Sequence, residues 1–250
     1  MSNALLSRSE AAETGLLEAV EAPFPHVMQN GFIDSVAFAQ LRDSFPECPP
    51  SSGPTGFSLY WKDDGYQQLL GASPAWRGLF DRFHSQTFID WAGLQFASEW
   101  KKAGCRIDLT QACYVPYHED RIDKERATLR KVEHAPHELW VRMDIYQGRV
   151  GYSRAVHVDH ARRLLTMLLY FSDHTDDGMT GGELLLHASP WKRWLQPATA
   201  ITPRENLMIA FPCSDRSHHS VAKIVAARHP RNYVQVQISS SVDAWPRGRS

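Results

Sequence analysis

The spacing of hydrophobic and polar positions changes near the middle of the chain. Apolar side chains recur at helical spacing over residues 34–45, 73–88 and 90–100. Asp34 and Ser73 stand just before two of these segments, where short polar side chains cap helix N-termini. The pattern therefore predicts a mainly helical region over residues 1–104, with only short strands.

After residue 104 the chain changes to short apolar runs that are separated by clusters of Gly and Asp. The runs rich in β-favouring residues span 106–114, 139–146, 164–171, 183–187, 207–211 and 233–239. Short strands at regular spacing with turn residues between them are typical of a sandwich or barrel. We expect an α+β fold with a mainly β core, in which helices support a double-stranded β-helix (jelly roll).

The expected organisation is one domain over residues 1–250, with the jelly roll over 105–245. A strongly charged segment over 117–140 interrupts the β-rich half, and its composition indicates a solvated excursion beside the first long strand. A lid or a substrate-recognition element would have the same composition, so both interpretations stay open. Residues 4–20 favour a short helix or a frayed arm.

Composition excludes several classes of protein. The formal net charge is -1 and the pI is about 6.9, whereas a nucleic-acid-binding domain usually carries a basic surface. No apolar stretch approaches the roughly 20 residues that span a bilayer, and the N-terminus lacks a secretory pattern. We expect a cytoplasmic protein with no nucleic-acid or membrane partner. The four cysteines have no metal-binding or disulfide spacing.

The segment His157-Val158-Asp159 is the sharpest candidate for chemistry. Alternate side chains on a strand point to the same face, so His157 and Asp159 would converge. Two imidazoles and one carboxylate form the face that binds non-haem Fe(II) with coordination positions left open. His218 and His219 point to opposite faces of a later strand, so one of the two can supply the third ligand.

An ordered series of motifs strengthens this interpretation. The series comprises segments 144–151 (DIYQGRVG), 157–160 (HVDH), 164–172 (LLTMLLYFS), 180–184 (TGGEL), 219–221 (HSV) and 231–234 (RNYV). In this order the chain resembles the prolyl-4-hydroxylase-like branch of the 2-oxoglutarate and Fe(II)-dependent oxygenases. The resemblance implies Fe(II), 2-oxoglutarate as co-substrate and O2, with ascorbate as an auxiliary reductant.

The resemblance also implies roles for individual residues. His157, Asp159 and His219 would hold the iron and serve as the catalytic centre. Arg231 and Tyr170 would bind the distal carboxylate of 2-oxoglutarate, since an Arg side chain matches a carboxylate with two hydrogen bonds. Tyr146 would line the same pocket. Arg228 competes with Arg231, because the separation from His219 to Arg231 is longer than in most of the family.

The implied activity is oxidative decarboxylation of 2-oxoglutarate to succinate and CO2, coupled to hydroxylation of an unactivated C–H bond. The substrate would be a small molecule or an amino-acid side chain, and the oligomeric state is left open. Two alternatives belong to other classes. A cupin-type metalloenzyme would keep the histidines without using 2-oxoglutarate, and a jelly-roll binding or sensor protein would not catalyse a reaction at all.

Overall fold

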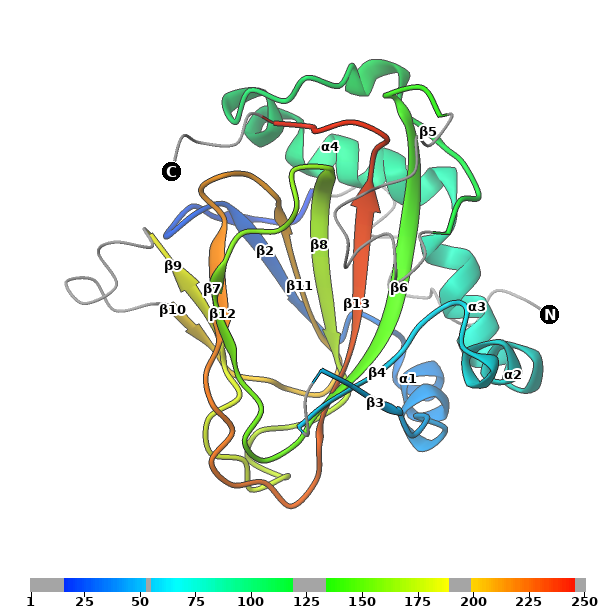
Figure 1. Ribbon diagram of the computed structural model, residues 1–250, viewed down its shortest axis with the longest axis vertical. Coiled ribbons are helices and arrows are strands. Elements are labelled where there is room, and N and C mark those ends of the chain that lie inside the picture. The colour runs from blue at the N-terminus through cyan, green and yellow to red at the C-terminus, as the bar shows by residue number, and fades with distance from the viewer. Residues whose placement is uncertain (1–15, 53–54, 119–133, 189–198, 246–250) are drawn as a thin grey trace.

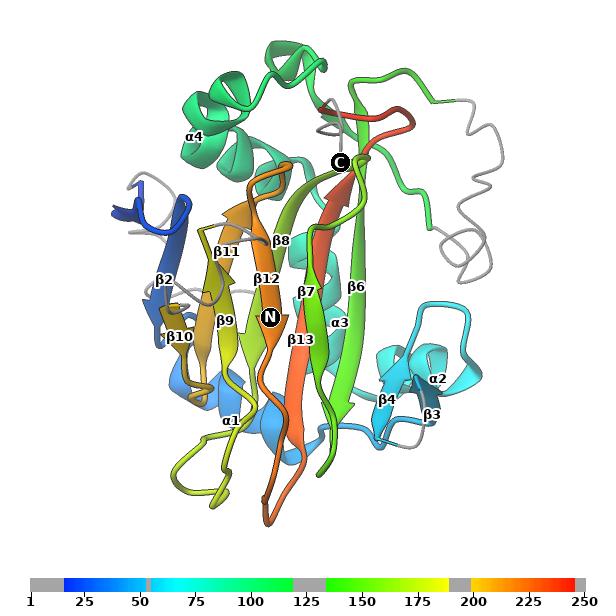
Figure 2. The ribbon, with the colours of Figure 1, turned by 60° about the vertical axis from the view of Figure 1, so that its left-hand side comes forward.

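The computed structural model describes residues 16–52, 55–118, 134–188 and 199–245. Within them, two β-sheets face each other and helices cover the outer side of the larger sheet (Figure 1). This arrangement confirms the predicted jelly roll with helical support. Figure 2 shows the smaller sheet in front of the larger one, with β7 and β12 crossing the view of β8 and β13.

The larger sheet combines strands from both halves of the sequence. Its strands in spatial order are β1 (Ala19–Val20), β2 (His26–Asn30), β11 (Leu207–Pro212), β8 (Arg163–Tyr170), β13 (Arg231–Ser239), β6 (Glu138–Gly148), β4 (Gly56–Leu59) and β3 (Pro50–Ser52), with β5 (Cys113–Tyr114) beside β6. The smaller sheet has the order β10 (Thr199–Ile201), β9 (Leu184–His187), β12 (His218–Val221) and β7 (Arg154–His157). All pairs are antiparallel except that of β5 with β6.

Three of the four described helices begin where a capping side chain accepts hydrogen bonds from backbone N–H groups of the first turn. The four described helices are α1 (Ser35–Asp43), α2 (Asp64–Ala72), α3 (Pro74–Phe83) and α4 (Gln86–Lys102). Asp34 accepts hydrogen bonds from the first turn of α1, and Ser73 does the same for α3, as predicted. Ser85 caps α4, which therefore begins at residue 86 rather than at the predicted residue 90.

Several sequence predictions about the N-terminal half are wrong or incomplete. The predicted strand over 106–114 is mostly a loop with a 3₁₀ turn, because Asp108 caps residues 109–111 and only Cys113 and Tyr114 pair with β6. Helix α2 was not predicted. Strands β3 and β4 pair with each other, since Pro50 is the register partner of Phe57 and Ser52 that of Gly56.

Two further predictions fall partly outside the described residues. Residues 1–15 of the predicted 4–20 helix lie outside them, while Ala19 and Val20 form a strand. Residues 119–133 of the charged excursion over 117–140 lie outside them as well. Its last residues, 138–140, already belong to β6, so the excursion is shorter than predicted.

Alternation along the strands separates two apolar clusters. Val141, Met143 and Ile145 of β6 point outward and pack with the helices. Tyr146 points inward and packs against a second cluster between the sheets, which includes Tyr170 of β8 and Tyr233 of β13. Side chains on this inner face therefore define the interior of the jelly roll, where the candidate site lies.

Within the described residues, no helix combines the length and apolar character needed to cross a membrane. All four cysteines are free thiols, as their spacing predicted.

Candidate metal centre and anion pocket

His157, Asp159 and His219 meet between the two sheets. One potential ligand atom from each lies within 4.8 Å of the others. Strands β12 and β7 are antiparallel, and His219 is the direct register partner of His157, which brings their ring centroids to 4.2 Å. Nε2 of His219 lies 4.0 Å from Oδ2 of Asp159. The three side chains thus offer two nitrogens and one oxygen to a single point.

Asp159 reaches this point differently from the sequence prediction. Strand β7 ends at His157, so Asp159 lies just beyond the strand and alternation does not orient it. Instead, the hydroxyl of Thr166 on β8 donates a hydrogen bond of 2.5 Å to Oδ2 of Asp159. The thiol of Cys213 lies 3.7 Å from the same oxygen. These two contacts hold the carboxylate of Asp159 in place.

Backbone carbonyls orient both imidazoles. Nδ1 of His157 lies 2.9 Å from the carbonyl oxygen of Ala155, and Nδ1 of His219 lies 2.9 Å from that of Ser217. A carbonyl oxygen can only accept, so Nδ1 is the protonated nitrogen in each ring. Nε2 of each neutral ring then carries the lone pair that a metal requires.

The protonation states also suit a metal ion. Burial, together with the charge of His219, lowers the pKa of His157 to about 4. Burial alone would raise the pKa of Asp159, but the charges of His219 and Arg163 and the hydrogen bond from Thr166 bring it to about 2. At neutral pH, His157 is therefore neutral and Asp159 is ionised. The donor set fits Fe(II), which favours imidazole and carboxylate ligands.

His218 lies outside this cluster. Its Nδ1 lies 3.3 Å from the carbonyl oxygen of Arg216, and its side chain is only partly buried. His219 is buried and its ring centroid lies 5.0 Å from that of Phe211 on the inner face. The geometry therefore agrees with the choice of His219 over its neighbour.

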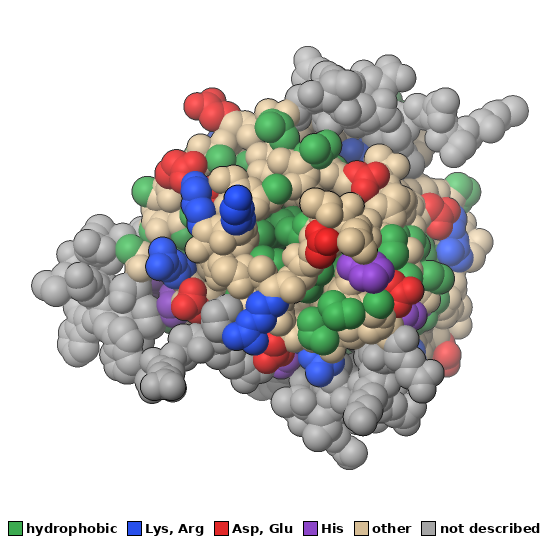
Figure 3. Space-filling view, turned by 90° about the horizontal axis from the view of Figure 1, so that it is seen from above, with side chains coloured by type: hydrophobic (Ala, Val, Ile, Leu, Met, Phe, Trp, Pro, Cys, Tyr) green, Lys and Arg blue, Asp and Glu red, His purple; other side chains and the backbone are tan. Residues whose placement is uncertain are grey.

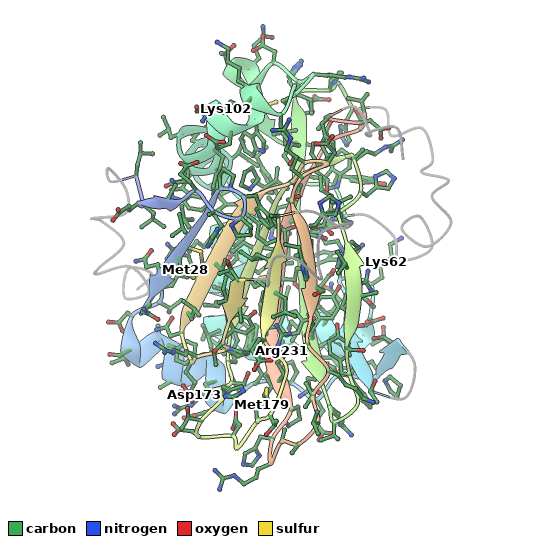
Figure 4. All side chains as sticks on the ribbon, turned by 90° about the vertical axis from the view of Figure 1, so that its left-hand side faces the viewer. Met28, Lys62, Lys102, Asp173, Met179 and Arg231 are labelled. Atoms are coloured by element: carbon green, nitrogen blue, oxygen red, sulfur yellow. The ribbon has the colours of Figure 1, made fainter. Side chains whose placement is uncertain are left out.

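A buried cation lies in the same interior. Arg231, at the start of β13, is fully buried, and its Nη2 donates to the hydroxyl of Tyr170 at 2.9 Å. Its Nε and Nη1 are also buried but have no hydrogen-bond partner in the part of the chain that the structure describes. Figure 4 shows Arg231 inside the fold, toward the end where Asp173 and Met179 lie. A buried guanidinium with open donors is suited to an anion.

Arg228, the competing residue, lies elsewhere. Its side chain is exposed and its Nη2 donates to the backbone carbonyl of Asp176 at 2.6 Å. Of the two arginines, only Arg231 shares the interior with the metal-ligating cluster.

Tyrosine side chains surround the guanidinium. The carbon atom Cζ of Arg231 lies 5.0 Å from the ring centroid of Tyr170 and 4.4 Å from that of Tyr233. Tyr146 stacks on Tyr233 at 5.2 Å, but its hydroxyl donates to Asp144 at 3.2 Å rather than contacting Arg231. Tyr152 reaches the hydroxyl of Tyr233 at 3.4 Å. Tyr170 and Tyr146 both pack in the inner cluster between the sheets.

Sequence reasoning missed several residues of the site. Thr166 is the only hydroxyl-bearing residue between Arg163 and Leu169, which was a usable signal for a buried polar role. Tyr233 gave a similar signal, since it follows Arg231 by two residues and must share its strand face. Cys213 gave none, because it follows its apolar strand as an ordinary small residue.

Residues 141–236 match the profile of a family described as the 2OG-Fe(II) oxygenase superfamily. Over this part of its β-rich core, the chain is similar to that superfamily. It is accordingly a 2-oxoglutarate-dependent Fe(II) dioxygenase, with Fe(II), 2-oxoglutarate and O2 as its cofactor and co-substrates. The recognition made from the ordered motifs is confirmed. No curated protein sequence matches the chain significantly.

Solved structures support the fold of this oxygenase. One is a 2OG-Fe(II) oxygenase family oxidoreductase from Burkholderia pseudomallei, with a TM-score of 0.52 and 12% identity over 90% of this chain and 88% of that one. Another belongs to the prolyl 4-hydroxylases from Phytophthora capsici, with a TM-score of 0.52 and 14% identity over 88% of this chain. The match spans 60% of that prolyl 4-hydroxylase. At such low identity the likeness concerns the fold alone.

The end of the oxygenase seen from above is shown in Figure 3. Described charged side chains of both signs are scattered over this face, and hydrophobic side chains lie in a recess near its centre.

Proposed function

We propose that this oxygenase couples oxidative decarboxylation of 2-oxoglutarate, to succinate and CO2, with hydroxylation of an unactivated C–H bond. The substrate would be a small molecule or an amino-acid side chain. His157, Asp159 and His219 would hold the iron, and Arg231 with Tyr170 would bind the distal carboxylate of 2-oxoglutarate. The observation that carries this proposal is the buried, incompletely paired guanidinium of Arg231, which shares one interior with the His–Asp–His cluster.

Each residue has a defined task in this proposal. When bound, the iron supplies activation of O2 and oxidation of the C–H bond. The imidazoles of His157 and His219 and the ionised Asp159 would hold the metal, while the hydrogen bond from Thr166 orients the carboxylate. Arg231 orients the co-substrate through paired N–H groups. The packed walls between the sheets exclude bulk water, which strengthens these electrostatic contacts.

The alternatives considered from the sequence lack comparable support. A cupin-type enzyme without 2-oxoglutarate would have no use for a buried Arg231 with open donors. A non-catalytic binding or sensor protein would tolerate loss of the metal-ligating residues, whereas all three side chains converge. We also propose that residues 1–250 act as one oxygenase domain, because β2 and β4 complete the sheet that carries the site.

The proposal can be tested without knowing the substrate. Apo protein is prepared anaerobically, Fe(II) and then 2-oxoglutarate are added, and the visible spectrum is recorded with metal analysis. We expect a charge-transfer band that requires both additions. It should be absent in His219→Ala and retained in His218→Ala, which is the matched control on the opposite strand face. A folded, iron-loaded wild type without the band would refute the proposal.

A further inference from the structure

A buried ion pair on the inner face of β6 has no task in the proposed function. Nε of Arg142 donates to Oδ2 of Asp144 at 2.6 Å, and the hydroxyl of Tyr146 donates to the same oxygen at 3.2 Å. Arg142 is 5% exposed and Asp144 is 1% exposed. Burying two charges between the sheets carries a large desolvation cost, which such a pair recovers only in part. The pair therefore calls for a functional explanation.

The strand register places this pair beside the metal-ligating cluster. Gln237 of β13 is the partner of Arg142 on one side and of Thr166 on the other. Side chains of direct register partners lie on the same face of a sheet. Thr166 in turn holds Asp159. Because neighbouring strands are about 4.8 Å apart, the backbone of Arg142 lies roughly 10 Å from that of Thr166, across the floor of the site.

One oxygen of the pair is left without a partner. Oδ1 of Asp144 is buried and accepts no hydrogen bond in the described parts of the chain. Native proteins rarely leave a buried carboxylate oxygen in this state, and a missing partner often arrives with a ligand. The group that completes Oδ1 must be a hydrogen-bond donor.

The co-substrate cannot be that donor. At neutral pH, 2-oxoglutarate presents only carboxylate and keto oxygens, all of which accept. Its proposed anchor is also distant, because Arg231 pairs with Gly148, four residues along β6 from Asp144. Four residues of a strand correspond to about 13 Å. Nη1 of Arg142 is itself buried without a hydrogen-bond partner among the described residues, so the pair offers both an open donor and an open acceptor to a molecule that enters the site.

Resting on the proposed function, we propose that Asp144 determines substrate specificity by accepting a hydrogen bond from an N–H or O–H group of the oxidised substrate. Arg142 neutralises the charge of Asp144, so an alcohol, an amide or an amine can occupy the position. Trp140 follows on the same strand face, and its indole N–H is buried with no hydrogen-bond partner among the described residues. It would donate to an acceptor of the same substrate. The substrate class is thus polar, not a bare hydrocarbon chain.

The test compares the wild type with a double variant, Arg142→Met/Asp144→Leu. Replacing a buried ion pair by apolar residues of similar volume usually preserves the fold, whereas removing one partner strands the other charge. Both proteins are loaded with Zn(II) in place of iron, which permits ligand-observed NMR without turnover. The probes are matched triplets that end in an amino, hydroxyl or methyl group, such as 2-phenylethylamine, 2-phenylethanol and propylbenzene.

We expect the donor-bearing probes to bind the wild type at least about tenfold more tightly than their methyl analogues. This preference should disappear in the double variant. Asp144→Asn keeps an accepting oxygen but carries no charge. This variant therefore distinguishes a neutral donor, the alcohol, from a charged donor, the ammonium group. Preference for the alcohol should survive this substitution, and preference for the ammonium form of the amine should be lost.

Equal affinity within each triplet in the wild type would overturn the inference, because water would then suffice to satisfy Oδ1. A preference that persists in the double variant would also overturn it. Titration of 2-oxoglutarate into the same samples reports on the proposed function separately. Its affinity should change by less than about twofold in the double variant, since Arg231 lies elsewhere on the wall. Failure of the wild type to bind 2-oxoglutarate would refute the proposed function itself.

Discussion

Thr166 and Asp159 are joined by a hydrogen bond of 2.5 Å that links the central strand β8 to the candidate metal centre. The bond holds Oδ2 of Asp159, the oxygen that lies 4.0 Å from Nε2 of His219. Asp159 lies beyond the end of β7, so strand alternation does not orient its side chain. The hydrogen bond from Thr166 orients it instead.

Replacing Thr166 by Val keeps the shape of the side chain and removes the donor. We expect the affinity for Fe(II) to fall about 10- to 100-fold, because partners of metal ligands contribute at this level. Competitive metal titration against a chelator measures the change. Thr166→Ser restores the hydroxyl and should recover most of the affinity. Unchanged affinity in the Val variant would show that Asp159 needs no such support.

Arg231→Lys keeps a positive charge but loses the planar pair of N–H donors. We expect the dissociation constant for 2-oxoglutarate, measured through the anaerobic charge-transfer band, to rise about tenfold or more. Arg228→Lys is the matched control at the exposed position and should leave it unchanged. The reverse result would transfer the anchor to Arg228.

Histidine burial outside the site predicts an acid-sensitive fold. Burial lowers the pKa of His84 to about 3, and its ring stacks on Phe80 at a centroid distance of 3.7 Å. In the unfolded chain a histidine takes up a proton near pH 6.5, so the unfolded state binds more protons between about pH 6.5 and pH 3. The free energy of unfolding should therefore fall as the pH drops through this window.

His84→Asn keeps a donor for the carbonyl of Phe80 but cannot titrate. Between pH 6.5 and pH 3, protonation of His84 should lower the free energy of unfolding of the wild type by about 3–5 kcal/mol. The variant should not show this part of the fall. Urea denaturation across the pH range measures the difference, and His229→Asn serves as the control at an exposed position. Parallel pH profiles for wild type and His84→Asn would contradict the prediction.

Gly181 occupies a backbone conformation with φ of +81°, and an added Cβ would lie 1.9 Å from the carbonyl oxygen of Lys223. Gly181→Ala should destabilise the fold by more than about 2 kcal/mol, since both the conformation and the space exclude a side chain. Gly71→Ala in α2, where no atom lies within 4 Å, should be neutral or slightly stabilising. Thermal unfolding of both variants measures the contrast.

The sequence predicted most of the β-rich half because its signals are local. Apolar runs predicted β8, β11 and β13, and capping residues predicted where α1 and α3 begin. The convergence of His157 with Asp159 was also expected, since their motif specifies residue type and order.

Long-range pairings were not predictable in the same way. Strands β2 and β4 are short, and their place in the larger sheet depends on partners far along the chain. The buried pair of Arg142 and Asp144 was missed because charged residues normally face solvent. Only the register of β6 with β13 shows that these side chains point between the sheets.

The larger sheet joins the earliest and the latest strands of the chain. Val27 of β2 pairs with Ala210 of β11, and β13 lies between β8 and β6. Such non-local pairing delays folding, because the first strands must wait for partners that the ribosome makes much later. His219 and Arg231 are also synthesised after β2, β6 and β8. The nascent chain is therefore expected to emerge without iron and to acquire it only when translation of the sheet is complete.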